Sequence, residues 1–508
     1  ERKWQSDMKY RSTRDFSQET VSAQAIAQGI CENGGLFVPE TFPKLTQQDF
    51  NFLQNADYQT RAQKILSMYL TDFSAEEIED CVRKAYTEEK FPGGPAPLSL
   101  VNIDSANLYL LELWHGPTCA FKDIALQLLP HLLTKSLQKI QTNKTAIILV
   151  ATSGDTGKAA LEGFRDVPGT KILVFYPEDG VSAMQKRQMV TQEGKNVFVC
   201  AIAGNFDDAQ SGVKKLFTNP EIRQKLQEHG EMFSSANSIN LGRLLPQIVY
   251  YISAYCDLVK ESRIKEGEQV NIVVPTGNFG NILAAFYAKQ MGLPVHKLIC
   301  ASNSNNVLTD FLRTGIYDRN RTFYTTISPS MDILISSNLE RLLSHLTKSD
   351  SQVHEWMDSL SKTGRYEVTD SVKDSLKNLF WAGCCNDEST KQTIHNLFCD
   401  EHYLCDPHTA VAVNVYHQYL SETKEEDIPA IIASTASPYK FSDNVLSAIL
   451  EKPYDSEDDF QKAVKLSELS DTEIPEPIKA LSNKKVRFTE SCHPEEMKQE
   501  VLKFSDAE

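Results

Sequence analysis

Five short runs of almost wholly apolar residues recur along the chain, and they restrict its possible folds more than any other feature. The runs are AIILVA (146–151), KILVFY (171–176), NIVVP (271–275), KLICA (297–301) and AIIAS (430–434). Runs of this length without polar alternation are typical of strands buried on both faces of a parallel sheet. Helix-patterned segments separate them. The sequence therefore predicts an α/β fold with a mostly parallel, covered sheet.

The composition disfavours several classes of partner. The 508 residues carry a formal net charge of −16, which argues against broad contact with nucleic acid or an anionic membrane. No run approaches the roughly 20 apolar residues of a membrane span. Eleven cysteines are scattered without a disulfide framework or a metal-ligand spacing. We therefore expect reduced thiols, a cytoplasmic location and no metal site.

Lys122 lies in HGPTCAFKDIAL (115–126), a stretch with the pattern of a buried helix. Thr118 is placed to cap this helix, and Pro130 disturbs its pattern further on. The residues three, four and seven positions after the lysine are apolar, so its stem lies on an apolar stripe. Two interpretations stay open from this stretch alone. The ammonium reaches solvent, or the amine is desolvated, has a lowered pKa and can form an imine with a carbonyl compound.

A loop of small residues follows the first apolar run, in TSGDTGKAAL (152–161). Its hydroxyl and glycine residues are Thr152, Ser153, Gly154, Thr156 and Gly157. A tight loop that opens a helix presents unpaired N–H groups, which favour an anion. The loop is not a Walker loop, because the first glycine and the Ser or Thr after the lysine of that motif are missing. An anion site and a purely structural turn both stay open.

A second loop of this kind, PTGNFGN (275–281), follows the third apolar run. It lacks the G-x-G-x-x-G dinucleotide fingerprint and is suited to a phosphate monoester. A third polar cluster, SSANSINLGRLLPQ (234–247), places Asn237, Ser238 and Arg243 at a helix start. The Arg243 guanidinium can bind an oxyanion, although helix capping explains the serine and the asparagine equally well. We call the loops that begin at Thr152 and at Pro275 the two anion cradles. Together with Lys122, they indicate a cofactor that carries an aldehyde and a phosphate, pyridoxal 5′-phosphate.

Seven motifs, spread over nearly the whole chain, resemble those of the threonine synthases, which are fold type II pyridoxal-phosphate enzymes. They are YRSTRD with ENGGLFVPE, LWHGPTCAFKD, TSGDTG, NSINLGR, PTGNFGN, DPHTAVAV and STASPYKF. Their order along the chain is that of the family, which makes the set far more specific than any single motif.

The resemblance implies a role for each motif residue. Lys122 forms the imine link to the cofactor, Asp155 lies beside its phenolic oxygen, and Thr435 meets its pyridine nitrogen. Many relatives have Asn where this chain has Asp155, and an acid there leaves the direction of the hydrogen bond open. The cofactor phosphate is held by Gly277, Asn278, Phe279, Gly280 and Asn281. The substrate carboxylate is held by Ser153, Gly154 and Thr156, and the substrate phosphate by Asn237, Ser238 and Arg243, with Lys158 as a looser candidate. For His115 and His408 a structural role is favoured.

The activity implied by the resemblance is that of a carbon–oxygen lyase. It converts O-phospho-L-homoserine and water into L-threonine and phosphate, the last step of threonine biosynthesis, with Lys122 as the base. Alternatives are a related phospho-lyase, a serine/threonine dehydratase or O-acetylserine sulfhydrylase, and a non-catalytic ligand-binding relative. The second phosphate site weighs against the dehydratase and the sulfhydrylase. Joint retention of Lys122, both cradles and Thr435 weighs against the non-catalytic relative. The expected partner is this small molecule, and the chain is either a monomer or a homodimer.

The implied fold is similar to the tryptophan synthase β subunit, with two open α/β domains that flank the cofactor cleft and a mainly helical N-terminal domain. The expected domains are 1–95 (N-terminal), 96–140 with 246–450 (large, cofactor-binding) and 141–245 (small). We expect residues 302–405 to be a helical elaboration of the large domain. The acidic tail, 451–508, is expected to pack on that domain.

Overall fold

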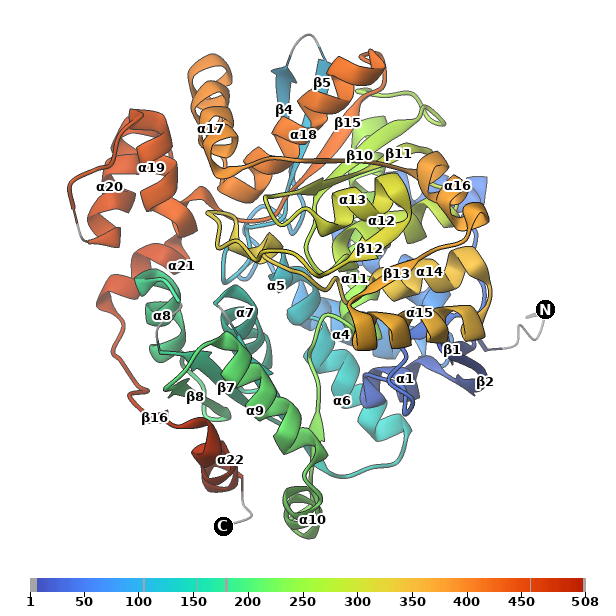
Figure 1. Ribbon diagram of the computed structural model, residues 1–508, viewed down its shortest axis with the longest axis vertical. Helices are drawn as coiled ribbons and strands as arrows, with labels where there is room; N and C mark the ends of the chain where they lie inside the picture. The colour runs from blue at the N-terminus through green and yellow to red at the C-terminus, as the bar shows by residue number, and fades with distance from the viewer. Residues whose placement is uncertain (1–6, 104–105, 153, 179–180, 457, 506–508) are drawn as a thin grey trace.

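Two sheets form the centre of the protein (Figure 1). The structure is a computed structural model that describes residues 7–103, 106–152, 154–178, 181–456 and 458–505. The six-stranded sheet has the order β14-β11-β10-β15-β5-β4 and is parallel except for the antiparallel pair β4–β5. Its strands are β4 (Leu98–Ile103), β5 (Ala106–Glu112), β10 (Val270–Pro275), β11 (Val295–Ser302), β14 (Phe380–Cys384) and β15 (Ala430–Ser434). Three of the predicted apolar runs form β10, β11 and β15, as expected for a covered parallel sheet.

The five-stranded sheet has the order β16-β8-β7-β6-β9, and all its pairs are parallel. Its strands are β6 (Thr145–Ala151), β7 (Thr170–Pro177), β8 (Val197–Ile202), β9 (Glu231–Ser234) and β16 (Ser491–Cys492). The other two predicted runs form β6 and β7. The helices beside this sheet are α7 (Asp155–Phe164), α8 (Ala183–Val190), α9 (Phe206–Thr218), α10 (Pro220–Glu228) and α22 (Met497–Phe504).

The central strands of both sheets are buried on both faces, which explains why these strands are almost wholly apolar. Alternate residues of one strand belong to different cores, since successive side chains point to opposite faces. In β10, Ile272 packs into the main core, whereas Val273 belongs to a second cluster on the other face. In β6, Ile148 belongs to the main core and Ile147 to a third cluster. The α/β fold with covered parallel sheets is therefore confirmed.

The N-terminal region is helical, as expected, but it also contains a small antiparallel sheet of order β2-β1-β3. Its elements are β1 (Tyr10–Ser12), β2 (Asp15–Thr20), α1 (Ser22–Gln28), β3 (Phe37–Pro39), α2 (Gln47–Asn55), α3 (Tyr58–Tyr69) and α4 (Ala75–Ala85). Capping boxes at Thr46 and Ser74 satisfy the first N–H groups of α2 and α4. Helices α2 and α3 pack against the long helix α11 (Leu241–Lys260), which joins this region to the rest of the molecule.

The region 302–405 is largely helical, as expected, but it also contributes strands. Strand β14 is added at the edge of the six-stranded sheet, and two short strands pair with each other. Its elements are α13 (Val307–Thr314), β12 (Ile316–Asp318), α14 (Leu339–Thr347), α15 (Asp350–Thr363), β13 (Arg365–Glu367), α16 (Asp370–Leu379) and α17 (Asp387–Glu401). The sequence FWAGC was missed because a five-residue edge strand with only two large apolar side chains gives a weak signal.

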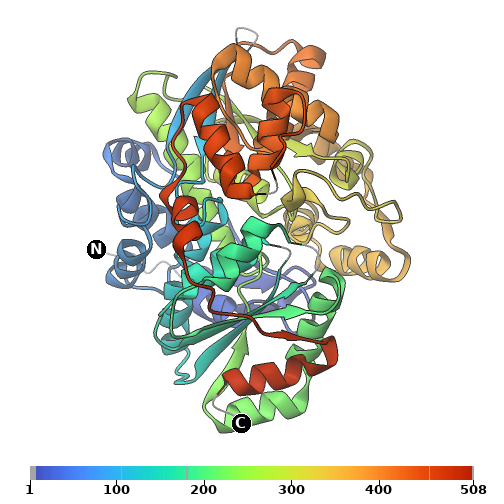
Figure 2. The same ribbon diagram turned by 90° about the vertical axis from the view of Figure 1, so that its left-hand side faces the viewer.

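The acidic tail also differs from the expectation that it packs on the large domain. Helices α20 (Asp459–Ser470) and α21 (Glu476–Lys479) do lie there, beside α19 (Ser442–Leu450). The chain then runs down the molecule to the other sheet (Figure 2), where β16 pairs with β8 and α22 packs in the core of that sheet. The tail therefore joins the two sheets.

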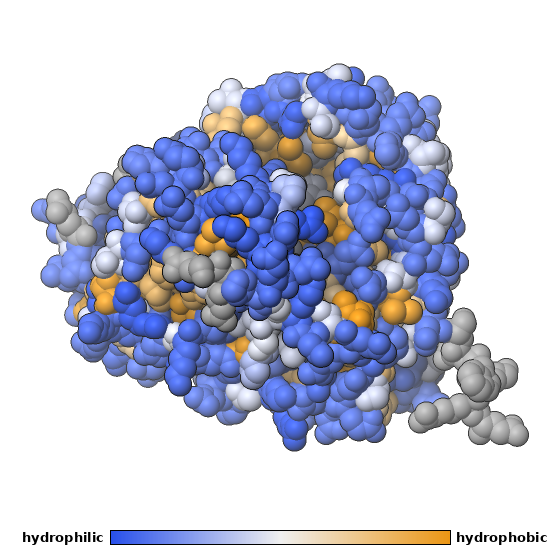
Figure 3. Space-filling view, turned by 90° about the horizontal axis from the view of Figure 1, so that it is seen from below, coloured by the Kyte–Doolittle hydropathy of each residue, from blue (hydrophilic) through white to orange (hydrophobic). Residues whose placement is uncertain are grey.

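The face seen in Figure 3 is mostly hydrophilic, and hydrophobic residues appear on it only in separate patches. Among the described residues, no helix combines the length and the apolar character needed to cross a membrane.

Candidate active site

Lys122 begins α5 (Lys122–Leu126), next to the carboxyl end of β15. The N–H of Phe121 donates to the carbonyl oxygen of Thr435 at 2.8 Å, and the N–H of Ser437 donates to the carbonyl oxygen of Cys119 at 3.0 Å. These bonds fix the loop before the lysine against the segment that follows β15. Helix α5 is short because α6 (Leu129–Lys139) restarts with a proline in its first turn, as the sequence indicated.

We expected Thr118 to cap the helix, but α5 has no side-chain cap. Thr118 is instead hydrogen-bonded to the side chain of Asp123. The backbone N–H and the hydroxyl of Thr118 donate to the two carboxylate oxygens of Asp123 at 2.8 Å and 2.6 Å. Burial raises the pKa of Asp123 to about 6 despite these bonds. The carboxylate thus orders the loop in front of Lys122.

The surroundings of Lys122 favour the second interpretation of this lysine, that of a desolvated amine. Its side chain is half-buried, and burial lowers its pKa to about 8, since the charged form loses hydration. The nearby carboxylate of Asp155 opposes this shift, while the cations Arg243 and Lys440 add to it. A substantial fraction of the amine is therefore neutral near physiological pH.

Asp155 forms a buried ion pair with Lys440, a residue whose role the sequence did not reveal. The Lys440 Nζ lies 2.7 Å from Oδ1 of Asp155 and donates to the carbonyl oxygen of Thr118 at 2.9 Å. Burial alone would raise the pKa of Asp155, but Lys440 and Lys122 outweigh it and hold that pKa well below its usual range. Lys440 lies in the motif STASPYKF, and only the fold brings it to a residue at the start of α7.

The loop before α7 is shaped by Gly154 and Thr152. Gly154 has φ of 148°, and a Cβ there would collide with the side chain of Gln185. The Thr152 hydroxyl oxygen accepts from the N–H groups of Gly154 and Gly157 at 3.0 and 2.9 Å, so this threonine serves the loop itself. Thr156 is half-buried in the first turn of α7. Ser153, the remaining predicted carboxylate ligand, lies outside the described residues.

Lys158 lies on the first turn of α7, where its N–H donates to the carbonyl oxygen of Gly154 at 3.3 Å. Its Nζ donates to Oε1 of Gln192 at 2.6 Å and lies 3.5 Å from Oε2 of Glu162. The side chain is buried, and these two partners engage two of the three donors of its ammonium. Lys158 stays a looser candidate for the substrate phosphate.

The second loop leads into α12 (Gly280–Gln290), and its carbonyl groups accept hydrogen bonds from the segment 336–338. A serine hydroxyl (Ser336) donates to the carbonyl oxygen of Gly277 at 2.7 Å, and the N–H of Asn338 donates to the carbonyl oxygen of Asn278 at 2.9 Å. A Cβ on Gly277 would lie 2.5 Å from the carbonyl oxygen of Ser330, so only glycine fits. With its carbonyl groups engaged, the loop presents N–H groups at the helix start.

Phe279 and Asn281 of this region also have defined conformations. Phe279, which precedes α12, adopts a left-handed conformation with φ of 68°. Asn281 accepts at Oδ1 from the hydroxyls of Tyr250 and Tyr251. Its Nδ2 is a buried donor that has no hydrogen-bond partner in the part of the chain that the structure describes. The predicted phosphate residues, Gly277 to Asn281, are thus gathered at one helix start with a donor available.

Arg243 is a buried cation on the first turn of α11. Its Nη1 donates to the carbonyl oxygen of Ala236 at 3.1 Å, and its Nε has no partner within the described ranges. Burial lowers the pKa of Arg243 to about 10. Among the described residues no ion pair neutralises this guanidinium, so an anion from solution would satisfy it.

The loop 235–240 before α11 lies next to the α12 loop. The Asn338 side chain donates to the carbonyl oxygen of Ser238 at 3.2 Å, while its backbone binds Asn278 as described above. Asn237 is exposed beside it. The segment 336–338 thus connects the two predicted phosphate sites, a link between distant loops that no local pattern reveals.

The two histidines of the motifs have hydrogen-bond partners. The Nδ1 of His408 lies 2.7 Å from Oδ2 of Asp406, and its Nε2 accepts from the N–H of Ser330 at 3.1 Å. His115 lies 3.0 Å from Oε1 of Glu112 and stacks on Trp114. These contacts agree with structural roles for both.

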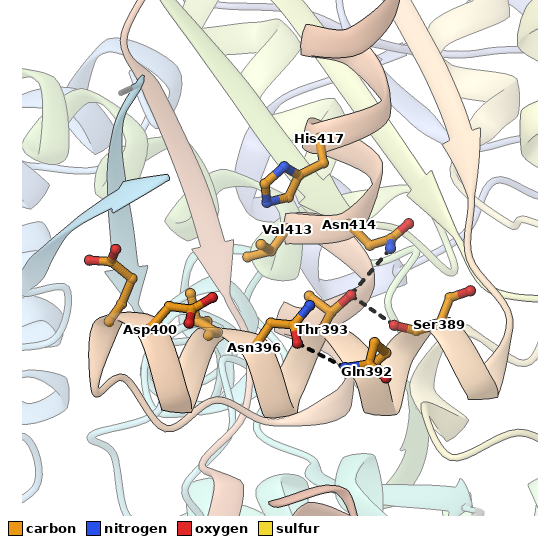
Figure 4. A pocket seen from close by; sticks show the side chains of 10 residues that line it. Ser389, Gln392, Thr393, Asn396, Asp400, Val413, Asn414 and His417 are labelled. Carbon is orange, nitrogen blue, oxygen red and sulfur yellow. Dashed lines mark hydrogen bonds between the residues drawn. The ribbon is translucent and has the colours of Figure 1, made fainter. Parts of the chain in front are cut away.

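A separate cavity of about 470 Å³ lies between α17 and α18 (Pro407–Thr423). Figure 4 shows Thr393 at its wall, where the hydroxyl accepts from Asn414 and donates to the backbone of Ser389. None of the predicted site residues lines this cavity, so it is not the site of Lys122.

Comparison with known proteins gives the class and the family. The model of the family described as pyridoxal-phosphate-dependent enzyme matches residues 89–371. Together with the half-buried lysine and the glycine cradle, this match defines the class: a fold type II pyridoxal-phosphate-dependent enzyme. The models described as threonine synthase N terminus and threonine synthase, C-terminal match residues 9–86 and 409–501. The chain belongs to the threonine synthase family.

Individual relatives agree with this family. Threonine synthase of Saccharomyces cerevisiae is 35% identical, and the match covers 97% of each chain. Threonine synthase-like 1 of Homo sapiens is 40% identical over 88% of this chain, and the chain spans only 60% of that protein. A crystal structure described as threonine synthase from Brucella melitensis with bound PLP aligns with a TM-score of 0.86 at 33% identity, over 98% of this chain and all of the other.

Proposed function

We propose that this chain is a threonine synthase that uses pyridoxal 5′-phosphate to convert O-phospho-L-homoserine and water into L-threonine and phosphate. The observation that carries the proposal is the pairing of a desolvated lysine with a buried arginine that has no acidic partner among the described residues. The charge of Arg243 reaches Lys122 and contributes to the lowered pKa of that lysine. A proton acceptor and an anion site therefore lie in one site.

The residues fit the cofactor. The N–H groups at the start of α12 and the unpartnered Nδ2 of Asn281 would hold its phosphate, Lys122 would bind its aldehyde, and Thr435 lies beside the loop of that lysine. A Cβ at Gly277 would collide with the carbonyl oxygen of Ser330, so the loop that forms this cradle requires glycine. When bound, pyridoxal phosphate supplies an electron sink for the negative charge that forms at the substrate Cα.

The chain itself supplies proton transfer and anion binding. The neutral amine of Lys122 takes the proton from the substrate Cα, for which a pKa of about 8 is well matched near neutral pH. Arg243 binds the substrate phosphate and stabilises its charge as it leaves Cγ. Gly154 and Thr156, at the start of α7, would hold the substrate carboxylate through backbone N–H groups and a hydroxyl.

The test is an assay of the purified protein loaded with pyridoxal phosphate. We expect a visible absorption band from the lysine-bound cofactor, and equal amounts of phosphate and L-threonine from O-phospho-L-homoserine. L-serine, which has no phosphate, should react far more slowly. Release of phosphate with 2-oxobutyrate instead of threonine would identify a related phospho-lyase, and turnover of unphosphorylated serine would identify a dehydratase. Absence of the band would refute the cofactor assignment.

The compartment and the domain limits are also proposals. All eleven cysteines are free thiols in the structure, which supports a cytoplasmic location. The two sheets support a division into a large domain (96–140 with 246–450) and a small domain (141–245), with β16 of the tail completing the sheet of the small domain. Limited proteolysis of the holoenzyme would test these limits.

A further inference from the structure

Lys440 and Asp155 are far apart in sequence and meet inside the site. Lys440 lies in η2 (Pro438–Phe441), just after β15, and Asp155 begins α7. Their side chains are 1% and 5% exposed, and the Nζ–Oδ1 distance is 2.7 Å. Such a buried pair is costly to desolvate, and apolar residues of similar size often stabilise a protein as well or better. Stability alone therefore does not explain it.

We propose that Lys440 is a positioning residue that keeps Asp155 ionised and turned as a hydrogen-bond acceptor toward the Lys122 amine and the bound cofactor. This inference rests on the proposed function. Lys440 also donates to the carbonyl oxygen of Thr118, in the loop before Lys122, so one ammonium fixes both the carboxylate and that loop. The side chain of Lys440 acts through Asp155 and need not touch the substrate.

The geometry of the carboxylate supports this role. Lys440 and Gln185 both bond Oδ1 of Asp155, at 2.7 and 3.4 Å. In the described ranges no hydrogen bond is made to Oδ2, which leaves that oxygen to accept. An ionised carboxylate can only accept, whereas an asparagine or a protonated acid at this position could also donate. A polar cofactor atom that faces Oδ2 must therefore carry the proton.

The charge balance around Asp155 depends on Lys440. The charged and titratable groups that face this cluster are Lys122 and Asp123 of α5, Arg243 of α11, His408 of α18, Lys440 of η2 and the thiol of Cys119 in the loop before α5. Without Lys440, Asp155 loses its only direct ion-pair partner among the described residues. Burial would then favour uptake of a proton, which would convert an acceptor into a donor.

The test is a double-mutant cycle on the holoenzyme, with the pH titration of the cofactor's visible band as the readout. The variants are Lys440→Met, Asp155→Asn and the double variant, with Lys440→Arg as the conservative replacement. Lys462→Met is the matched control, because Lys462 also pairs with an aspartate, Asp443, at 2.8 Å but lies outside the site on α20. The loss of the donor to Thr118 is common to Lys440→Met and the double variant, so it cancels in the cycle.

We expect Lys440→Met to move the midpoint of the titration by about one pH unit or more, the size of shift that a contacting opposite charge produces. In the Asp155→Asn background the same change should move it far less, and Lys440→Arg should retain most of the native midpoint. Lys462→Met should leave it unchanged. Equal shifts with and without Asp155 would overturn the inference, because Lys440 would then act on the cofactor directly.

Folding of the variants also discriminates. If Lys440→Met alone fails to fold but the double variant folds, the defect is the unpaired carboxylate, which supports the pairing. If both fail, Lys440 is required independently of Asp155, and the inference is wrong. A native protein that binds no pyridoxal phosphate would refute the proposed function, whereas a native band with an additive cycle would refute only this inference.

Discussion

The N–H of Ser330 donates to Nε2 of His408 at 3.1 Å and thereby assigns the proton of this histidine to Nδ1, which lies 2.7 Å from Asp406. The same Ser330 places its carbonyl oxygen against Gly277 of the phosphate cradle. The histidine thus supports the loop that closes one side of the cradle.

Replacement of this histidine tests the structural assignment. His408→Gln should lower the free energy of unfolding by about 1 to 3 kcal/mol, because it disrupts buried hydrogen bonds, and should leave the cofactor's visible band in place. Urea unfolding of the apo-protein measures the first effect and a spectrum the second. The exposed His354→Gln is the control. Loss of turnover with unchanged stability would instead assign a catalytic role to His408.

Asp123 makes stability depend on pH in a defined window. Its native pKa of about 6 lies above the unfolded value of about 3.9, so the native state holds a proton that the unfolded state has lost. Its contribution is complete below pH about 4 and is lost as pH rises through about 6. Relative to Asp123→Asn, the native protein should therefore lose about 2 to 3 kcal/mol of unfolding free energy between pH 4 and pH 7. A difference between the two proteins that does not vary with pH would contradict the assignment.

Lys122 should capture the cofactor faster as pH rises. Only the neutral amine attacks an aldehyde, and burial lowers the pKa of this lysine to about 8. The rate at which the visible band forms on mixing apo-protein with pyridoxal phosphate should rise through pH 8 and level off above it. Stopped-flow absorbance gives the profile. Lys122→Ala should form no band, and the exposed Lys362→Ala should behave like the native protein. A rise that continues to pH 10.5 would show an ordinary, solvated lysine.

Arg243 should make the protein respond to phosphate. A buried guanidinium that forms no ion pair among the described residues is costly, so Arg243→Met should raise the melting temperature of the apo-protein in phosphate-free buffer. In the holoenzyme, where the cofactor would fill the α12 cradle, inorganic phosphate should stabilise the native protein and have much less effect on the variant. In the holoenzyme the variant should keep the visible band, while KM for O-phospho-L-homoserine rises about 10- to 100-fold, the loss expected for charged hydrogen bonds. Equal stabilisation of both proteins by phosphate would place the anion elsewhere.

Local pattern was sufficient for those parts of the fold that are made of consecutive residues. The apolar runs predicted β6, β7, β10, β11 and β15, because a strand that is buried on both faces needs apolar side chains at nearly every position. The two residues of β16 carry no such signal, since their pairing with β8 depends on tertiary contacts.

The site shows the same limit. Lys122, Arg243 and the α12 loop could be identified because their chemistry is evident within a few residues. The contact of Lys158 with Gln192 could not be predicted, because Gln192 belongs to a different segment. Lys440 was missed although its motif was recognised, since its partner at the start of α7 is brought to it only by the tertiary fold.

The late position of β16 also has a consequence for synthesis. Cys492 of this strand lies 292 residues after Cys200 of β8, its neighbour in the sheet. While the ribosome makes the intervening chain, the β8 edge exposes unpaired backbone groups, and such an edge can template aggregation. During synthesis the β8 edge of the five-stranded sheet therefore stays unpaired until β16 is made. A transcript truncated before β16 would leave this sheet edge permanently unpaired.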